Sequence, residues 1–540
     1  MSDSAESSAV STSEQQERAP KERGKGGGKR GKAGNAGASS TEASGTQGGQ
    51  VDTNKPFSFN KVENFPAWYE AVLVYADIMD KRYDVKGMPV FTPYGYYMHN
   101  KIMTLLEEQW EAQGIEKVQF PILVPYSYLE KEKEHIRGFS KEVFWVTRGG
   151  EKEFEQPMAM RPTSETAMYT MFSKWVQSIR DLPLKVHQTC CVYRYETKST
   201  LPLIRAREIF WNEAHTCHAT PEDALETLED AWRAYLWLLE DQMGVYGLRL
   251  RRPVWDKFAG AEHTDVLDVT LPSGKVLQSV GAHYLGQKFS TSFDIKFLNR
   301  SNEQEHAYMT CYGVSTRMLA SMLAAHGDEK GLVLPPKICK IQIVIIPIIM
   351  KDKEEAVVQY CEHWLSTLKA AGFRVYLDDG RNKTNREKFQ YWEVMGVPLR
   401  MELGPRDAES NKVCLFKRNS ASPKDKKFVD GPEAVDACHV LLEELDAELH
   451  RASKAFHEDH IRTCMTMDEV ADVIEKNGGF ARIPFHTDGP DGKEAEALIH
   501  ERCGAEIRGF IPTESAPEEG TLCIVTGQAA KVWAYVARSY

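Results

Sequence analysis

The segment from Arg205 to His215 has the pattern of a β-strand in which charged and aromatic side chains recur at every second position. Successive side chains of a strand point to opposite faces, so one face would carry Arg205, Arg207, Ile209, Trp211, Glu213 and His215. The preceding strand-like segment, 189–196, ends with Arg194 and Glu196 on a common face. An ordinary half-buried hairpin alternates apolar and polar residues. The two segments therefore predict a β-hairpin whose polar face has a function.

The side chains on this face suit two kinds of ligand group. Guanidinium groups bind phosphate or carboxylate oxygens through two parallel hydrogen bonds. Glutamate, tryptophan and histidine together can line a small pocket for a cation with an apolar body. The alternative, a salt-bridged surface hairpin without a ligand, stays open at this point.

Composition narrows the class of protein. The chain has 540 residues, 42% hydrophobic and 27% charged, which is typical of a globular protein of about two to four domains. It has no apolar run of about 18 residues and no apolar leader, so we expect neither a transmembrane span nor a secretory signal. The 11 scattered cysteines favour reduced thiols in a cytoplasmic protein. A net charge of −11 argues against nonspecific binding of nucleic acid, but not against a local basic groove.

The first part of the chain, residues 1–52, is rich in Ser, Gly, Ala, Thr and Gln, so we expect a disordered tail. Its basic cluster, Lys21–Lys32, either adds electrostatic affinity for RNA or is simply solvated.

Residues 53–335 are predicted to form an α+β domain around an antiparallel sheet. Helical spacing of apolar residues predicts a helix from Pro221 to Val245, with Leu225, Leu228 and Trp232 on its inner stripe. The segment 117–125 is predicted to be a strand, and Pro121 places it at a sheet edge, where a partner chain can pack.

The pattern changes after Pro335-Pro336. Apolar strands then alternate with helices, which predicts a compact, mostly parallel α/β domain over residues 336–450. Residues 451–540 are predicted to form a small C-terminal α/β domain.

Two expected helix starts carry polar residues. In the segment 161–166, Pro162, Thr163 and Ser164 match capping chemistry, while a hydroxyl beside Glu165 also suits the ammonium of a small ligand. The segment 313–317 opens a second helix, whose free amides and arginine suit a polyphosphate. Neither a Gly-x-x-x-x-Gly-Lys-Ser/Thr loop nor a dinucleotide fingerprint occurs, which disfavours the two common nucleotide-binding folds.

In this order, the Pro-bearing strand, the aromatic-Arg-x-Glu hairpin and the Gly-x-Ser-Thr-Arg helix start resemble the three motifs of class II aminoacyl-tRNA synthetases. The segments 161–166, 210–215 and 283–287, with the final Ser539-Tyr540, resemble the eukaryotic and archaeal type of prolyl-tRNA synthetase. The resemblance implies a class II catalytic domain at 53–335, an anticodon-binding domain at 336–450 and a C-terminal domain related to zinc-binding domains at 451–540.

The resemblance also implies roles for individual residues. The proline site would consist of Thr163, Glu165, Arg194, Trp211, Glu213, His215 and His283. The ATP site would consist of Arg194, Glu196, Arg205, Gln278, Gly281, Ser315 and Arg317. Thr163 and Glu165 would recognise the secondary ammonium of proline, and Arg317 would stack on the adenine. Arg194 would act in catalysis by bridging the proline carboxylate and the α-phosphate.

The implied reaction has two steps. The carboxylate of L-proline attacks the α-phosphorus of ATP and pyrophosphate leaves; prolyl-adenylate then passes proline to the 3' end of tRNA(Pro), without a protein general base. We expect Mg²⁺ on the ATP phosphates, held mainly by ATP and by carboxylates such as Glu196. We also expect a homodimer, and anticodon contacts from Arg381, Lys383, Arg386 and Lys388.

The sequence departs from the family in two places. The stretch 216–312 has no room for the large editing insertion of bacterial relatives, and a proline pocket rejects similar side chains only about 10- to 200-fold, so misactivation of alanine or cysteine is expected. Cys464, Cys503 and Cys523 are isolated, as is His486 with Asp488. Four-coordinate zinc normally takes two close ligand pairs, so we expect no zinc in the C-terminal domain.

Two alternatives remain. The first is a class II synthetase for another small amino acid; threonine-specific relatives read their substrate with zinc, and the matching Cys and His set is not visible in the sequence. The second is an inactive synthetase-like binding protein, against which the presence of Arg194, Arg205, Gln278 and Arg317 argues.

Overall fold

The computed structural model describes residues 57–88, 90–129, 142–380 and 382–540. The predicted tail at 1–52 and Arg381 lie outside the described residues. No helix in the described part of the chain is long and apolar enough to span a membrane.

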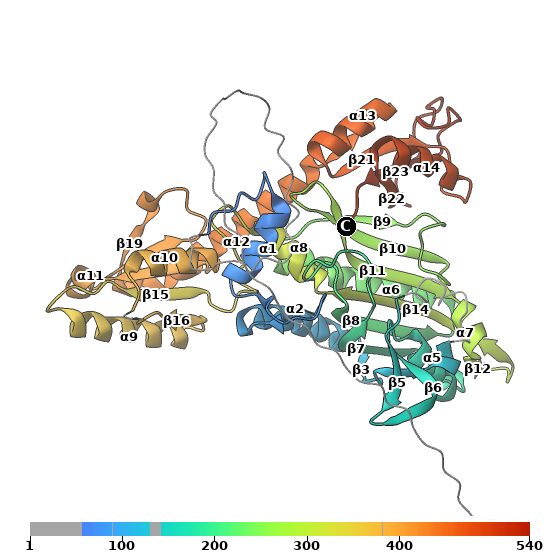
Figure 1. Ribbon diagram of the computed structural model, residues 1–540, viewed down its shortest axis with the longest axis horizontal. Coiled ribbons are helices and arrows are strands. Elements are labelled where there is room, and N and C mark those ends of the chain that lie inside the picture. The colour runs from blue at the N-terminus through green and yellow to red at the C-terminus, as the bar shows by residue number, and fades with distance from the viewer. Residues whose placement is uncertain (1–56, 89, 130–141, 381) are drawn as a thin grey trace, which may run out of the picture. The chain divides into compact units, whose positions relative to one another are not determined.

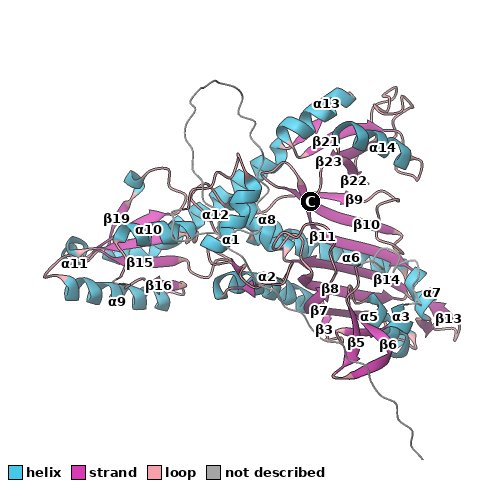
Figure 2. Ribbon diagram, in the orientation of Figure 1, coloured by secondary structure: helices cyan, strands magenta, loops and turns pink. Residues whose placement is uncertain are grey.

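An 11-stranded sheet, drawn in magenta in Figure 2, is the largest element of the fold. Its spatial order is β20 (Ile461–Thr463), β21 (Phe480–Phe485), β23 (Val532–Ala537), β22 (Glu506–Phe510), β9 (Leu248–Arg251), β10 (His263–Thr270), β11 (Val276–Gly286), β14 (Tyr308–Ser315), β8 (Glu208–His218), β7 (Leu184–Tyr193) and β3 (Glu116–Lys117). Only β20 and β3, at the two edges, run parallel to their neighbours. The predicted antiparallel catalytic sheet is therefore confirmed.

The predicted hairpin exists as β7 and β8, but it is shorter than expected. The strands pair antiparallel from Leu184↔Cys217 to Tyr193↔Glu208. Arg205 and Arg207 lie before β8, because their backbone N–H groups bond to the carbonyls of Leu201 and Gly87 instead of joining the ladder. The prediction that β8 extends back to Arg205 was wrong, whereas the alternation from Ile209 to His215 holds.

The strand predicted through Pro121 was also wrong. Glu116–Lys117 forms β3 at an edge of the large sheet, and Leu123–Pro125 forms β4 in a separate sheet with the order β4-β6-β5. The other strands of that sheet are β5 (Trp145–Gly149) and β6 (Lys152–Met160). Pro121 lies between the two short strands, because it has no N–H to give to a ladder.

Helices cover one face of the large sheet. α6 (Pro221–Leu236) packs on β8, β11 and β14, and α8 (Arg317–His326) packs on β11 and β14. α2 (Pro93–Ala112) contacts both helices, and α1 (Phe65–Tyr75) contributes to the same core. α6 ends nine residues before the predicted Val245, in a π-helical turn at Trp237–Gln242. Leu225, predicted to point inward, is 39% exposed because Ala224 and Leu228 occupy the buried stripe.

We expect His326, at the end of α8, to make the stability of the protein depend on pH in the acid range. Its Nε2 atom lies 2.7 Å from the carbonyl oxygen of Met243, and burial lowers the pKa of the imidazole from 6.5 to about 4. The unfolded chain therefore binds a proton as the pH falls below about 6.5, while the folded chain does not. The stabilising effect is complete above that pH and is lost as the pH falls toward 4.

The variant His326→Gln keeps a polar group near the Met243 carbonyl but cannot titrate. We expect its melting temperature to fall less steeply than that of the wild type between about pH 6.5 and 4, as measured by circular dichroism. Equal slopes for the two proteins would show that His326 does not carry this dependence.

A second, five-stranded sheet has the order β16 (Val375–Leu377), β15 (Ile343–Pro347), β17 (Leu399–Leu403), β18 (Lys412–Lys417) and β19 (Lys427–Asp430). β15 pairs parallel with β16 and β17, while β17–β18 and β18–β19 are antiparallel. The sheet is thus mixed, not mostly parallel. α9 (Glu354–Ala370), α10 (Asn385–Val394), α11 (Pro405–Ser410) and α12 (Ala434–Asp459) accompany it (Figure 1). α12 runs through residue 450, where a domain boundary was predicted.

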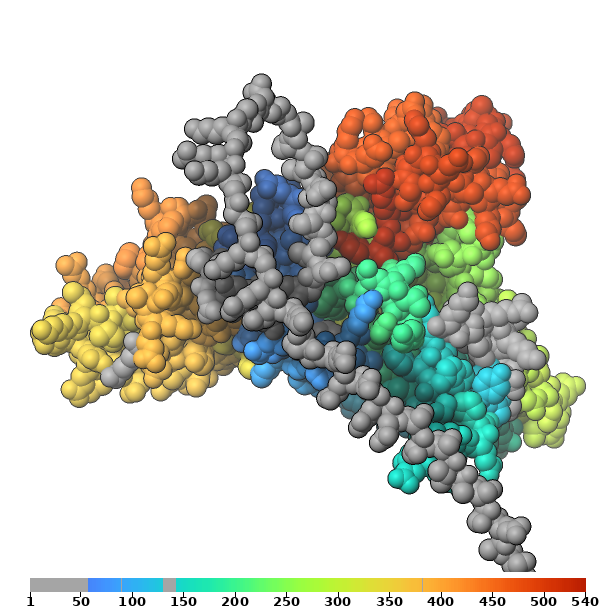
Figure 3. Space-filling model, viewed as in Figure 1, coloured from blue at the N-terminus to red at the C-terminus, as the bar shows by residue number. Residues whose placement is uncertain are grey.

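The C-terminal segment extends the large sheet. β22 pairs antiparallel with β9 through Phe510↔Arg251, so β20 to β23 continue the catalytic sheet. α13 (Met467–Asp472) and α14 (Gly492–Cys503) belong to this segment. In Figure 3 its red surface adjoins the light green surface of the catalytic part. The last residues of the chain are thereby brought to the catalytic sheet.

Candidate active site

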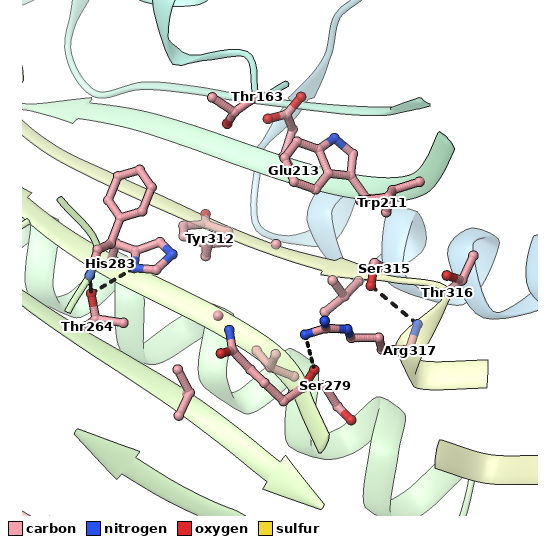
Figure 4. Close-up of a pocket in the computed structure, with 18 of the residues that line it drawn as sticks. Thr163, Trp211, Glu213, Thr264, Ser279, His283, Tyr312, Ser315, Thr316 and Arg317 are labelled. Carbon is pink, nitrogen blue, oxygen red and sulfur yellow. Dashed lines mark hydrogen bonds between the residues drawn. The ribbon is translucent and has the colours of Figure 1, made fainter. Parts of the chain in front are cut away.

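A cavity of about 510 Å³ lies over β8, β11 and β14, next to the first residues of α5 (Glu165–Trp175) and α8. Every residue predicted to bind proline or ATP lines it: Thr163, Glu165, Arg194, Glu196, Arg205, Trp211, Glu213, His215, Gln278, Gly281, His283, Ser315 and Arg317. In Figure 4, Thr163, Trp211 and Glu213 lie on one side of the cavity, while His283 and Arg317 lie farther apart along the sheet. Segments far apart in the sequence thus converge on one cavity.

Glu213 on β8 is the centre of a buried hydrogen-bond network. Its carboxylate accepts hydrogen bonds from Ser164 Oγ and from Gln188 Nε2, the latter at 2.8 Å, and its Oε2 atom lies 3.1 Å from His215 Nε2. Burial acts to raise the pKa of Glu213, but the bonds from His215, Ser164 and Gln188 outweigh it and lower the pKa. Glu213 is therefore a carboxylate held in a fixed position.

The start of α5 presents a second carboxylate. Glu165 is the first residue of the helix, it is buried, and it accepts a hydrogen bond from Thr163 Oγ1. Ser164 occupies the N-cap position, but its side chain makes no capping bond and turns to Glu213 instead. The capping interpretation is therefore wrong for the Ser164 side chain. The helix start places one hydroxyl and one carboxylate at the cavity.

A row of side chains crosses three neighbouring strands. Cys311 on β14 is directly opposite His215 on β8 and His283 on β11. His283 Nδ1 lies 2.9 Å from Thr264 Oγ1, and its ring packs on Phe258 at 4.5 Å between ring centroids. These contacts fix the imidazole of His283 at the wall of the cavity.

Arg194 follows β7 and reaches the cavity over Trp211, with 5.5 Å between its Cζ atom and the ring centroid. Its Nε atom donates a hydrogen bond of 3.0 Å to the Pro162 carbonyl. Burial lowers the pKa of Arg194, against the opposite effect of several carboxylates, of which Glu165 has the largest effect. The guanidinium of Arg194 thus lies near the carboxylates of Glu165 and Glu213 and also near the guanidinium of Arg317.

The other end of the cavity is cationic. Arg317, the first residue of α8, donates from Nε to the Ile204 carbonyl at 2.9 Å and from Nη1 to the Gln278 carbonyl at 3.4 Å. Burial, and then the charges of Arg194 and Arg205, lower the pKa of Arg317 to about 10. Ser315 Oγ accepts a hydrogen bond of 3.3 Å from the Arg317 N–H. Arg317 therefore begins the helix, whereas residues 313–315, predicted to open it, are the end of β14.

Glu196 and Arg205 lie in the loop between β7 and β8. Glu196 Oε2 is 3.9 Å from Arg205 Nε, and Glu196 Oε1 accepts a hydrogen bond of 2.9 Å from the Lys198 N–H. Arg207 does not line the cavity; its guanidinium donates to the Glu196 carbonyl and covers the Tyr195 ring. Arg207 therefore holds the loop in place.

A buried ion cluster beside the cavity was not predicted from the sequence. Asp268 on β10 accepts hydrogen bonds of 3.1 Å from both Nη atoms of Arg252 and one of 2.9 Å from Arg508 Nε. Arg252 Nη2 also donates to Gln278 Oε1 at 3.2 Å. Arg252 and Arg508 line the cavity. A signal was present in the sequence, because an aspartate inside the apolar strand 266–271 needs a buried cationic partner.

The last two residues, Ser539 and Tyr540, resemble those of prolyl-tRNA synthetases, but no function was predicted for them. Ser539 and Tyr540 line the cavity, Tyr540 N–H donates to the Val276 carbonyl, and Tyr540 Oη lies 2.8 Å from Ser273 Oγ. The end of the chain is therefore attached to β11.

The C-terminal cysteines do not form one cluster. Cys464 and Cys503 face the carbonyls of Arg462 and Ile499, and Cys523 Sγ lies 3.6 Å from His486 Nδ1. Among the described residues, no set of three His, Cys, Asp or Glu ligand atoms gathers in this segment. The absence of zinc from the C-terminal domain stays a prediction.

Among the described basic residues that were expected to contact the anticodon, Lys388 has the least exposed side chain. It is buried, and its Nζ atom donates to the Asp378 carbonyl at 2.9 Å. Lys383 lies 4.6 Å from the Tyr391 ring centroid and Arg386 is exposed. Lys388 therefore contributes to the domain's packing, whereas Lys383 and Arg386 remain candidates for RNA contacts.

Comparison with known families divides the chain into three matched parts. Residues 144–326 match the tRNA synthetase class II core domain (G, H, P, S and T), and residues 342–437 match an anticodon binding domain. Residues 467–540 match the C-terminal domain of prolyl-tRNA synthetase. Together with the antiparallel sheet and its cavity, these matches define a class II aminoacyl-tRNA synthetase.

Individual relatives narrow the class. The proline–tRNA ligase of Methanosarcina mazei is 40% identical over 491 residues, covering 91% of this chain and 100% of its own length. That of Thermofilum pendens is 40% identical over 487 residues, covering 89% and 98%. The chain belongs to the proline–tRNA ligase family, as the resemblance predicted.

Two solved structures agree. The Giardia lamblia prolyl-tRNA synthetase in complex with prolyl-adenylate is 44% identical, with a TM-score of 0.87 over 90% of this chain and 100% of its own. The Cryptosporidium parvum enzyme complexed with halofuginone and AMPPNP is 33% identical, with a TM-score of 0.85 over 90% and 99%. The predicted fold class and the assignment as an aminoacyl-tRNA ligase are confirmed.

Proposed function

We propose that the protein activates L-proline with ATP to prolyl-adenylate and pyrophosphate, and then transfers proline to the 3' end of tRNA(Pro). One observation carries this proposal: a single cavity holds the carboxylates of Glu165 and Glu213 together with the guanidiniums of Arg194, Arg205 and Arg317. Carboxylates suit the ammonium of an amino acid, and guanidiniums suit its carboxylate and the phosphates of a nucleotide. The two solved relatives, one in complex with prolyl-adenylate and the other with AMPPNP, support the same pair of ligands.

The proline end of the cavity is the one with the two carboxylates. Glu165 and Thr163 accept the secondary ammonium, since both point into the cavity from the start of α5. Trp211 and His283 bound the pyrrolidine ring, and His215 takes part indirectly by holding Glu213. The selection of proline thus rests on a buried charge pair and a pocket of fixed size.

The ATP end is the cationic one. Arg205, Ser315 and Arg317 contact adenosine and phosphates, with Arg317 against the adenine ring. Gln278 and Gly281 provide the floor on β11, where a Cβ atom at Gly281 would lie 3.2 Å from Gln278 Nε2. Glycine at 281 therefore leaves room for the side chains of Gln278 and His283.

The chemistry of the first step needs positioning and charge neutralisation. The proline carboxylate attacks the α-phosphorus and pyrophosphate departs, while Arg194, held by the Pro162 carbonyl, neutralises the oxygens of the transferred group. The second step, attack by the 3'-terminal adenosine of tRNA, uses no protein base in this proposal. Arg194 is therefore the residue to which we assign catalysis.

Mg²⁺ would bind the ATP phosphates and neutralise the charge of the leaving pyrophosphate. Glu196 fits this role, because its carboxylate is at the cationic end and its hydrogen-bond partner there is a backbone N–H. In this proposal the nucleotide itself supplies most of the ligands of Mg²⁺.

Pyrophosphate exchange into ATP with a panel of amino acids tests the proposal. We expect proline to support exchange, and alanine and cysteine to support it about 10- to 200-fold less efficiently in kcat/KM. Exchange with another amino acid in preference to proline would identify a different synthetase. No exchange with any amino acid would indicate an inactive binding protein.

We also propose how the enzyme meets tRNA, where it acts and how it assembles. Residues 336–450 bind the anticodon of tRNA(Pro), the enzyme acts in the cytoplasm, and two copies form a homodimer. Sedimentation equilibrium of the purified protein measures the last of these directly.

A further inference from the structure

Three metal-ligating side chains converge at the base of the cavity. One ligand atom each from Glu165, His215 and Cys311 lies within 4.8 Å of the other two, and all three residues are buried. They come from three different elements, α5, β8 and β14, and the last two are held opposite each other by strand pairing. The arrangement is therefore fixed by the sheet and the helix, not by flexible loops.

The proposed reaction uses these residues unequally. Glu165 is assigned to the ammonium of proline and His215 to the orientation of Glu213, but the thiol of Cys311 has no part in it. Cys311 Sγ is 3.9 Å from Glu165 Oε1 and points its proton at that carboxylate. A soft donor is thus placed beside a hard one among buried residues.

We propose that this cluster binds Zn²⁺, and that the ion competes with proline for the cavity. Sulfur, imidazole and carboxylate donors together select zinc over Mg²⁺ or Ca²⁺, which prefer oxygen. Donors around tetrahedral zinc, with bonds of about 2.0–2.3 Å, lie roughly 3.3–3.8 Å apart. The 4.8 Å limit of the present cluster means that side chains need to move by about 1 Å.

Tyr169 and Glu213, which contact His215, can keep favourable contacts when the metal ion binds. His215 Nδ1 lies 3.0 Å from Tyr169 Oη, so in the tautomer with Nδ1–H it donates to the phenol oxygen and its Nε2 lone pair is free for the metal. Glu213 Oε2, 3.1 Å from that Nε2 atom, is then next to the fourth coordination position. Binding forms an S–Zn bond and breaks the S–H bond of Cys311, whose proton leaves to solvent.

Competition with proline follows from Glu165. The inference rests on the proposed function at this point, because the same carboxylate oxygens would receive either the secondary ammonium or the metal ion. Occupation by Zn²⁺ removes the acceptor that proline needs, while the cationic end with Arg317 is left unchanged. Zinc should therefore raise the KM for proline and leave the KM for ATP nearly constant.

Metal binding is tested without any substrate. The chelator-treated full-length protein is titrated with Co²⁺, and we expect the near-ultraviolet charge-transfer band of a thiolate–Co²⁺ bond, which Zn²⁺ then removes. The band should be lost in Cys311→Ser and retained in Cys523→Ser, whose thiol lies beside His486 in the C-terminal segment. Loss in Cys523→Ser with retention in Cys311→Ser, or no band in the wild type, would overturn the site.

Competition is tested in two ways. Excess proline should abolish the Co²⁺ band of the wild-type protein, a measurement that needs no variant to fold. In pyrophosphate exchange at buffered free Zn²⁺, inhibition should be competitive with proline, and Cys311→Ser should raise the inhibition constant at least about tenfold. Inhibition competitive with ATP instead would contradict the inference. A band without proline-dependent exchange would refute the proposed function alone, and exchange without a band would refute the zinc site alone.

Discussion

Replacing Arg194 by alanine should lower proline-dependent pyrophosphate exchange by about 100- to 1,000-fold, with most of the loss in kcat. The physical reason is its position: the half-buried guanidinium lies over Trp211, is oriented by the Pro162 carbonyl, and is close to Glu165. In the proposed mechanism it neutralises charge that develops only as the α-phosphoryl group is transferred. Removing it takes away an interaction made mainly in the transition state.

Comparison variants separate catalysis from packing. Arg194→Lys keeps the charge but not the planar fork, and should recover only part of the activity. Arg207→Ala removes a guanidinium of the same loop that does not line the cavity, and should lose far less. His215→Ala should also lose far less than Arg194→Ala, since Glu213 keeps its bonds from Ser164 and Gln188. Equal losses for Arg194→Ala and His215→Ala would contradict the catalytic assignment.

The shared face of Trp211, Glu213 and His215 could be predicted from the sequence because it depends on local periodicity. Trp211, Glu213 and His215 alternate along one strand, and that alternation survived although β8 begins later than expected. The start of the strand was mispredicted because Arg205 and Arg207 bond to Leu201 and Gly87, and the second of these contacts is long-range. Strand parity is a local property, whereas strand length depends on distant partners.

Contacts between remote segments could not be derived from local patterns. Pro121 correctly indicated an interrupted ladder, but not that the two halves enter different sheets. In the sequence, Cys311 is one more apolar residue of a strand-like segment. Its position opposite His215 results from the pairing of β14 with β8. The continuation of the catalytic sheet into β22 likewise depends on a pairing between residues 251 and 510.

The Asp268 cluster shows what such remote contacts contribute to stability. Asp268 is 0% exposed and lies between Arg252 and Arg508, so Asp268→Ala leaves two buried guanidiniums without their shared partner. Breaking a buried ion pair from one side is destabilising by about 3–5 kcal/mol. We expect a loss of this size in the free energy of unfolding, measured by urea denaturation followed by circular dichroism.

Two further variants distinguish charge from shape. Arg508→Met leaves Asp268 paired with Arg252 and should be less destabilising than Asp268→Ala. The triple variant Arg252→Met, Asp268→Leu, Arg508→Met removes all three charges and should recover most of the loss, since apolar side chains of similar volume replace buried ion clusters well. A triple variant as unstable as Asp268→Ala would show that packing, and not the unpaired charge, causes the effect.

The same cluster connects stability to the nucleotide. Arg252, fixed by Asp268, donates to Gln278 Oε1 on the floor of the ATP end, and Arg508 reaches Asp268 from β22. Arg508→Met should therefore raise the KM for ATP in pyrophosphate exchange more than the KM for proline, and Arg508→Lys should restore part of it by returning the charge. Equal changes in both constants would mean that the C-terminal segment stabilises the fold without positioning Gln278. A selective change would show that β22, more than 200 residues beyond β10 in the chain, is a working part of the nucleotide site.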